Sequence, residues 1–216
     1  MTVQDAIQGR RSIRKYKPDA VAAEDLETIL QGARLAPSGC NAQPWRFVVV
    51  TDADLRNRLA GETMTLIGNE LMCRQAPVLI ACLAVVDAHC EIPDRMVELS
   101  KTDPEFAAPT IAKRTGRTLK SRFDSMPPQA RAAYMSLNTG IAMTHMMLQA
   151  TELGYGTCWM GAFDREKARE MLSVPRGIEI VGILALGRPD EDPSPRPRVA
   201  MDQLVFADQY GQSVVD

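Results

Sequence analysis

Five positive charges gather in residues 9–18 of the chain, at Arg10, Arg11, Arg14, Lys15 and Lys17. Arginine predominates among them, and its planar guanidinium group donates paired hydrogen bonds that suit a phosphate. In an extended stretch, Arg10, Ser12 and Arg14 share one face, so two guanidinium groups would flank one hydroxyl donor. The spacing therefore predicts a clamp for a phosphorylated ligand.

Two other interpretations of this segment are open. A nucleic-acid surface would need more positive charge and aromatic side chains for stacking, whereas the chain has a net charge of −2 and 5 % aromatic residues. A solvated face is the usual fate of a charge run. The familiar nucleotide motifs do not help, because GxxxxGK[ST] is missing and Trp159 replaces the third glycine in "GYGTCWMG". We therefore favour a phosphate site of another kind and expect no nucleic-acid partner.

Metal and membrane chemistry are not expected. The five cysteines include no CxxC pair, and the chain has two histidines. This composition predicts reduced thiols and no metal site. The longest apolar runs fall short of the roughly 18 residues that a membrane span needs, and the first residues do not resemble a signal peptide. We therefore expect a cytoplasmic protein without membrane association.

The elements that must position the basic segment combine amphipathic helices with buried strands. A capping box of Thr2 and Asp5 predicts a short helix over 3–9. Helical patterns predict further helices over 22–36, 52–60, 129–153 and 164–172. Continuous apolar runs predict strands buried on both faces over 45–51, 78–86 and 178–187. Strict strand–helix alternation is missing, so the order favours an α+β sandwich with helices on both faces of a mixed sheet.

The pattern predicts a single domain over 1–216 with two appendages. Residues 87–128 mix proline, charge and short amphipathic pieces, and we expect a helical excursion that forms a lid. Four prolines within 189–197 stiffen the chain that follows the last strand. Because Leu204, Val205 and Phe206 come after them, the tail over 193–216 is expected to lie on a partner subunit.

Four segments, in order, give the chain a resemblance to the FMN-dependent nitroreductase family: "RRSIRKYKPDAV", "ARLAPSGCNAQPWRFVVV", "LGYGTCWMGAF" and "IVGILALGRP". The first two are specific together, and the last two are weaker. The resemblance covers most of 1–60 and 129–190 and leaves the excursion uncovered. It implies a nitroreductase-like fold, an obligate homodimer with a domain-swapped C-terminal extension, and two FMN sites at the interface.

The resemblance also implies roles for individual residues. Arg10 and Ser12, with Arg11 close by, resemble the contacts to the FMN phosphate and ribityl chain, and Arg14 resembles the cation near N1 and C2=O of the ring. The loop that edges the flavin, from the partner chain, corresponds to Pro37, Ser38, Gly39, Asn41 and Gln43. This loop is open to a plainer interpretation, a turn before a strand. The segment over N5 and O4 corresponds to Trp159, Met160 and Gly161, with the Gly161 backbone near N5. The second phosphate anchor corresponds to Gly187 and Arg188.

The activity implied by the resemblance is a two-electron, ping-pong reduction. NAD(P)H would reduce the flavin, and an electron-poor small molecule, such as a nitroaromatic or a quinone, would then accept the electrons. A fixed cation near N1 stabilises the reduced ring, and no acid, base or nucleophile of the protein is required. Alternatives are a reductive dehalogenase or another specialised oxidoreductase of the superfamily, and a flavin- or nucleic-acid-binding protein without catalysis.

Four basic residues of the expected lid stand apart from this scheme: Arg114, Arg117, Lys120 and Arg122. They indicate an anionic substrate or the phosphate of NADPH. A solvated face of an amphipathic helix explains them equally well.

Overall fold

The computed structural model describes residues 1–103 and 107–213, and it confirms the α+β class. Four strands form one sheet in the order β1-β2-β4-β3. They are β1 (Trp45–Val50), β2 (Val78–Val85), β3 (Gly156–Met160) and β4 (Ile178–Gly187). A mixed sheet was predicted, whereas the three pairs of named strands are antiparallel, and the parallel contact in the described residues is an isolated bridge between Ser12 and Thr157 at the edge of β3. The continuous apolar runs indicate that both faces of the sheet are covered by helices. They do not indicate whether neighbouring strands run parallel or antiparallel.

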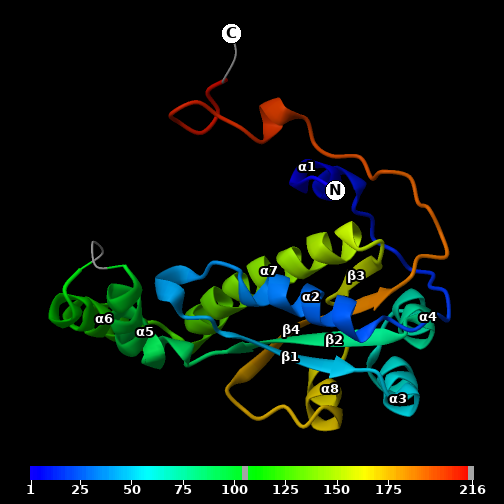
Figure 1. Ribbon diagram of the computed structural model, residues 1–216, viewed down its shortest axis with the longest axis horizontal. Helices are drawn as coiled ribbons and strands as arrows, with labels where there is room; N and C mark the ends of the chain where they lie inside the picture. Colours follow the sequence, from blue (N-terminus) through cyan, green and yellow to red (C-terminus); the bar gives the residue numbers. More distant parts are fainter. Residues whose placement is uncertain (104–106, 214–216) are drawn as a thin grey trace.

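Helices cover both faces of this sheet, as predicted (Figure 1). On one face lie α2 (Ala23–Arg34) and α7 (Pro128–Glu152), and on the other lie α3 (Ala53–Thr63), α4 (Ile67–Gln75) and α8 (Arg165–Met171). Strand β4 serves both layers, since Leu184 packs toward α7 while Ile183 and Ala185 pack toward the other face. The sheet is therefore the middle layer of a three-layer sandwich.

Helix α7 is the central helix, and it confirms the helix predicted over 129–153. At 1.5 Å per residue it is about 38 Å long. Met135, Met143 and Met146 are buried against the sheet. Its opposite side carries Leu137, which is 65 % exposed. A single chain thus leaves one apolar side of this helix uncovered.

The excursion is a helical hairpin. It contains η2 (Ala88–Glu91), α5 (Ile92–Thr102) and α6 (Pro109–Asp124), and part of it, residues 104–106, lies outside the described residues. Ile92, Met96 and Phe123 bury their side chains together with Met135 of α7. The hairpin therefore shares a core with the body instead of forming one of its own.

Beyond Asp192 the chain leaves the body as an extended arm, residues 193–213, with one short turn of helix, η3 (Met201–Gln203) (Figure 1). Residues 214–216 of the predicted tail lie outside the described part. Val199, Met201 and Leu204 are exposed on the arm. An arm that exposes apolar side chains fits the predicted contact with a partner, which stays a prediction. None of the described helices has both the length and the apolar character needed to cross a membrane.

A buried tyrosine ties three elements together and gives a stability test. The Tyr155 hydroxyl donates to Asp25 Oδ2 at 2.7 Å and accepts from the backbone N–H of Ala22 at 3.3 Å. Tyr155→Phe is expected to lower the free energy of unfolding by about 1.5 to 3 kcal/mol, because one acceptor is a carboxylate. Urea denaturation measures this change, with the exposed Tyr210 as the matched site for a Tyr210→Phe control. Equal midpoints for both variants would contradict the assignment.

Candidate functional site

The basic segment, residues 10–17, lies along the outer edge of the sheet. The backbone N–H of Ile13 donates to the Thr157 carbonyl of β3 at 3.0 Å, next to a parallel bridge between Ser12 and Thr157. Further along, the N–H of Lys17 donates to the Arg188 carbonyl just beyond β4, also at 3.0 Å. The segment therefore extends the sheet by a short outer strand and is held in place by backbone bonds.

Two glycines allow this close approach. A Cβ atom on Gly156 would meet the Ile13 side chain, and one on Gly187 would meet Pro77 and the Tyr16 ring. Ile13 and Tyr16 are buried as a result, and the Tyr16 hydroxyl donates to the Ile13 carbonyl at 2.7 Å. Gly187 thus acts by opening space for the basic segment, whatever contact it makes with a ligand.

The arginines of the basic segment differ in how many hydrogen bonds their side chains make. Arg11 Nη1 donates to the carbonyl of Gln8 at 2.6 Å, at the end of α1 (Val3–Gly9), and to that of Arg10 at 3.0 Å. Arg14 Nη1 donates to the Ser12 carbonyl at 3.1 Å, and the backbone N–H of Arg14 donates to Glu191. Arg10 has no side-chain hydrogen bond or ion pair with another described residue. It is therefore the cation of this trio most available to an anionic ligand.

Strand β3 offers a free edge beside these cations. The Thr157 carbonyl faces the basic segment, so alternation along the strand turns the backbone groups of Trp159 to the same outer side, and Gly161 follows just beyond the end of β3. The basic segment pairs with this edge only near Thr157 among the described residues. The N–H groups further along are available to the acceptor atoms of a flat heteroaromatic ring.

The side chains of this strand differ in what they can contribute. Met160 is buried, with its Sδ atom 3.6 Å from Cys73 Sγ, so it can reach the edge through its backbone alone. Trp159 is 53 % exposed and lines a hollow of about 250 Å³ together with Met143 and Met147. The Thr157 hydroxyl is buried and has no partner among the described residues.

No protein nucleophile is evident at this edge among the described residues. Cys158 is nearby, but burial raises the pKa of its thiol, although Arg14, Ser12 and Arg10 act in the opposite direction. Burial raises the pKa of Cys73 to about 12. Both thiols stay protonated near neutral pH. Across the described chain, no group of three or more His, Cys, Asp or Glu side chains is placed to hold a metal ion.

Arg188, the expected second phosphate anchor, lies at the end of β4 but is occupied. Its guanidinium group stacks over the Tyr155 ring at 4.2 Å from the centroid. Nη1 also donates to the Leu153 carbonyl at 3.3 Å, at the C-terminal end of α7, where a cation is favoured. In this arrangement the Arg188 side chain is bonded within the protein and helps to hold the chain around the site.

The loop Pro37–Gln43 is held in place by hydrogen bonds within the loop and to α7. Asn138 Oδ1 of α7 accepts the N–H of Gly39 at 2.9 Å, and Ser38 Oγ accepts the N–H of Gln43 at 3.0 Å. Asn41 and Gln43 have positive φ angles of 52° and 45°. Such a conformation is held only where surrounding contacts specify it. The loop is therefore more specialised than a plain turn.

This loop does not meet the basic segment within one chain. It leads directly into β1, whereas the segment borders β3, and these strands are the two edges of the sheet. Three strand spacings separate the edges by roughly 14 Å. The structure thus places the basic segment beside Thr157 and Arg188, with residues 159–161 further along β3 and just beyond it, and it leaves the loop on the other side.

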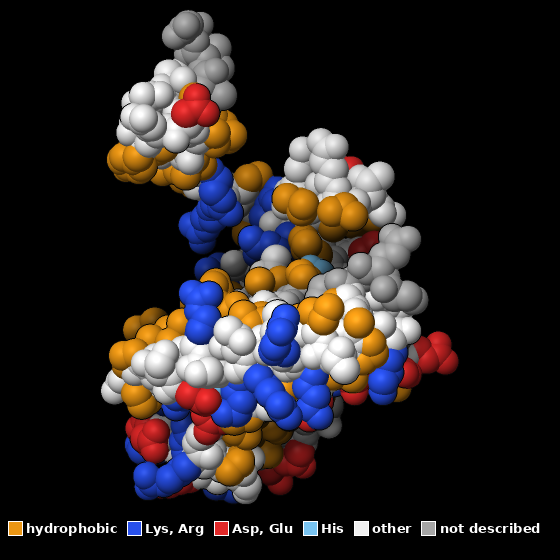
Figure 2. Space-filling model, turned by 90° about the vertical axis from the view of Figure 1, so that its left-hand side faces the viewer, with side chains coloured by type: hydrophobic (Ala, Val, Ile, Leu, Met, Phe, Trp, Pro, Cys, Tyr) orange, Lys and Arg blue, Asp and Glu red, His pale blue; other side chains and the backbone are white. Residues whose placement is uncertain are grey.

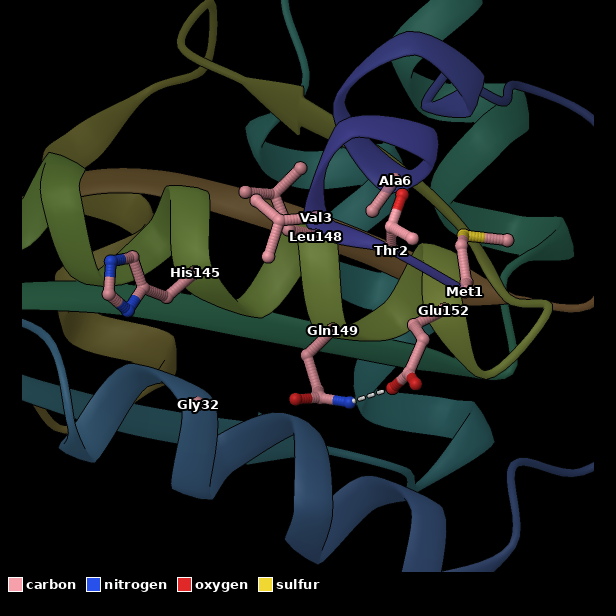
Figure 3. A pocket seen from close by; sticks show the side chains of 9 residues that line it. All are labelled: Met1, Thr2, Val3, Ala6, Gly32, His145, Leu148, Gln149 and Glu152. Carbon is pink, nitrogen blue, oxygen red and sulfur yellow. Dashed lines mark hydrogen bonds between the residues drawn. The ribbon is translucent and has the colours of Figure 1, made fainter.

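Figure 2 shows Lys and Arg side chains gathered in the hollow beneath the arm. A cavity of about 280 Å³ beside Arg11 and Ile13 is less suited to an anion, because Glu191 and Asp192 line it. A larger cavity of about 420 Å³ lies between α1, α2 and α7. Figure 3 shows Val3 and Leu148 there, with Gln149 donating to Glu152 at 2.6 Å. It contains no arginine or lysine and is therefore a poor candidate for a phosphate site.

Three positioning residues of the site were not predicted from the sequence. Asn138 holds Gly39, Glu191 accepts from the Arg14 backbone, and Asn69 Nδ2 of α4 donates to the Ala162 carbonyl beside Gly161 at 3.3 Å. A buried asparagine in an otherwise apolar helix was a visible signal for Asn138, since buried amides need partners. The other two act through contacts between distant parts of the chain.

Comparison with known proteins adds a family to this geometry. A family model described as the nitroreductase family matches residues 7–188. A Thermus thermophilus protein named NADH dehydrogenase is 29 % identical over 197 residues, covering 91 % of each chain. YdgI of Bacillus subtilis, provisionally named an NAD(P)H nitroreductase, is 28 % identical over 205 residues, covering 93 % of this chain and 94 % of YdgI.

A solved structure supports the same fold. It is a protein of Exiguobacterium sibiricum that is provisionally described as a nitroreductase and was solved in complex with FMN. It superposes with a TM-score of 0.81 at 21 % identity and covers 96 % of this chain and 97 % of its own. The overall fold of this chain thus recurs in a protein that was solved with FMN.

Proposed function

The chain belongs to the nitroreductase family, and from this premise we propose that it is an FMN-dependent oxidoreductase. Its electron donor would be NAD(P)H, and its acceptors would be nitroaromatics, quinones or similar electron-poor small molecules. The two substrates would react in turn, in a ping-pong sequence. FMN, when bound, supplies the hydride acceptance and donation. The names of the relatives, which include NADH dehydrogenase and NAD(P)H nitroreductase, support this class of reaction.

The observation that carries the proposal is the free edge of β3 beside an available arginine. Arg10 has no side-chain partner among the described residues, and the outward N–H group of Trp159 continues the edge on which Ser12 and Ile13 pair. A phosphate and a flat ring with acceptor atoms match these two features. The residues present therefore fit FMN.

Each residue then has a definite task. Arg10 and Ser12 would bind the phosphate and ribityl end, and Arg14 would place positive charge at the N1 and C2=O side of the ring. The Gly161 N–H would lie near N5. Arg14 is already oriented by its bonds to Ser12 and Glu191, and a cation fixed in advance stabilises developing negative charge without reorganisation.

The functional unit would be a homodimer, as family members typically are. The loop Pro37–Gln43 cannot border the β3 edge of its own chain, because it lies at the opposite edge of the sheet. A two-fold related copy could place its loop there. The exposed Leu137 of α7 and the apolar arm are surfaces that such a partner would cover.

An anaerobic titration tests the function. Protein reconstituted with FMN and desalted is expected to keep its flavin and to lose the visible flavin absorbance when NADH or NADPH is added. Addition of a nitroarene or a quinone should then restore the absorbance. Double-reciprocal plots at several acceptor concentrations should be parallel, as ping-pong turnover requires. A flavin that neither nicotinamide bleaches would overturn the proposal.

A further inference from the structure

Helix α6 carries a high positive charge. It holds Lys113, Arg114, Arg117, Lys120 and Arg122 against one acidic residue, Asp124. Its neighbour α5 is balanced, because Arg95 pairs with Glu91 at 3.0 Å and with Glu98 at 3.4 Å. The positive charge of the hairpin is therefore concentrated on one of its two helices, in a chain whose net charge is −2.

The five basic residues of α6 differ in whether their side chains have a partner. Lys120 is paired with Asp124 at 2.7 Å, and the same carboxylate lies 3.1 Å from Nε2 of the buried His89. The side chains of Lys113, Arg114, Arg117 and Arg122 make no ion pair or hydrogen bond with any other described residue. Lys120 thus belongs to the internal bonding of the hairpin, and the other four do not.

Three of these four free cations share one face of α6. Its buried side is made by Ala112, Gly116 and Phe123. At 3.6 residues per turn, Arg114 and Arg117 lie opposite that side, with Lys113 next to them, while Arg122 lies on the other flank. We call Lys113, Arg114 and Arg117 the α6 basic face.

Neighbours three and four residues apart on a helix repel when their charges are alike. Lys113 and Arg117 are four apart, and Arg114 and Arg117 are three apart, with no described acid to offset them. An anion bound across one turn would remove this repulsion. Two guanidinium groups also offer the paired donors that a phosphate accepts.

The basic face projects from the part of the chain that would reach the flavin. Ile92, Met96 and Phe123 of the hairpin share a buried cluster with Ala42, and Cys40 packs against it. The hairpin is thereby anchored to the loop Pro37–Gln43, which is the half of the site that one chain would lend to its partner. A ligand that enters above the flavin would pass this hairpin.

Resting on the proposed function, we propose that the α6 basic face binds the 2′-phosphate of NADPH. A 2′-phosphate carries close to two negative charges at neutral pH, and NADH lacks it. Recognition here would make the enzyme prefer NADPH as its donor. A nucleic acid fits less well, because the exposed side of α6 presents no aromatic residue on which bases could stack.

The test uses a double variant and a matched control. Arg114→Gln with Arg117→Gln removes two charges from the basic face. Lys101→Gln with Arg58→Gln removes two charges from exposed positions elsewhere. Isothermal titration at low salt measures the binding of 2′,5′-ADP and of 5′-AMP to each full-length protein as purified, and kcat/KM is measured with NADPH and with NADH.

We expect the wild type and the control to bind 2′,5′-ADP at least about tenfold more tightly than 5′-AMP, since charge-assisted bonds to phosphate are strong. The double variant should lose this difference, and its kcat/KM should fall by about tenfold for NADPH while staying within about twofold for NADH. The preference should also weaken as salt is raised.

Three results would overturn the inference: no preference for 2′,5′-ADP in the wild type, an undiminished preference in the double variant, or equal losses with both nicotinamides. Loss of binding to a fluorescent single-stranded oligonucleotide without loss of 2′,5′-ADP binding would also overturn it, in favour of a nucleic acid. If 2′,5′-ADP binding depends on α6 but neither nicotinamide bleaches the flavin, the phosphate site stands and the proposed reaction fails.

Discussion

Arg10→Ala protein is expected to be purified colourless and to bind added FMN on the order of a hundredfold more weakly than the wild type. The reason is that this guanidinium group is free of side-chain partners among the described residues, so its donors are available to a phosphate. Charge-assisted hydrogen bonds to a buried or partly buried anion contribute about 1.5 to 3 kcal/mol. The fold should survive the change, because the side chain makes no hydrogen bond or ion pair with another described residue.

Fluorescence quenching of FMN by the apoprotein measures this loss of affinity. Lys17→Ala is the matched control, because Lys17 lies in the same segment, is exposed and contributes its backbone N–H to Arg188. Circular dichroism shows whether both variants remain folded. A yellow Arg10→Ala protein with wild-type affinity for FMN would mean that the phosphate lies elsewhere, and the assignment of the whole β3 edge would then have to be abandoned.

Much of the frame that supports this edge could be predicted from the sequence. Long apolar patterns mark the helix over 129–153 and the strands over 45–51, 78–86 and 178–187. Such patterns predict buried elements well, because burial of apolar surface is the main force that stabilises the fold. The capping box of Thr2 and Asp5 also forms, with the backbone N–H of Asp5 donating to Thr2 Oγ1 at 3.1 Å. These features are encoded within a few residues of each other.

Other features depend on contacts between distant parts of the chain, which no local sequence pattern indicates. Helix α4 was not predicted, because it buries little beyond Met72 and Cys73 and exposes Ile67 and Leu71. The antiparallel pairing of the four named strands could not be derived either, because burial on both faces does not indicate strand direction. The family resemblance implies that Arg188 is a second phosphate anchor, which stays a prediction, and the contacts of its side chain with Tyr155 and Leu153 are not visible in the sequence.

The separation of the loop Pro37–Gln43 from the basic segment could not be derived from spacing either. Both segments are recognisable in the sequence, but only the strand order shows that they lie at opposite edges of one sheet. Under the proposed function, one chain would therefore hold two halves of two different sites. If so, the flavin site depends on the association of two chains, and any change that weakens the association should also release the cofactor.

The arm provides the means to test that dependence. Leu204→Asp with Val205→Asp is expected to convert the dimer into monomers at micromolar concentration and to release FMN together with the partner. Both side chains are exposed on the single chain. Burying a leucine or valine side chain contributes about 1.5 to 3 kcal/mol, so placing charges at both positions should weaken association on the order of a hundredfold or more.

Sedimentation velocity measures the oligomeric state, and absorbance at the flavin band in the same run reports which species carries the cofactor. Gln203→Asp with Gln209→Asp adds the same charge to exposed polar positions of the arm and should remain a yellow dimer. A flavin-loaded monomer of the first variant would show that one chain completes the site alone. In that case the loop Pro37–Gln43 would have no part in flavin binding, because the sheet keeps it away from the β3 edge of its own chain.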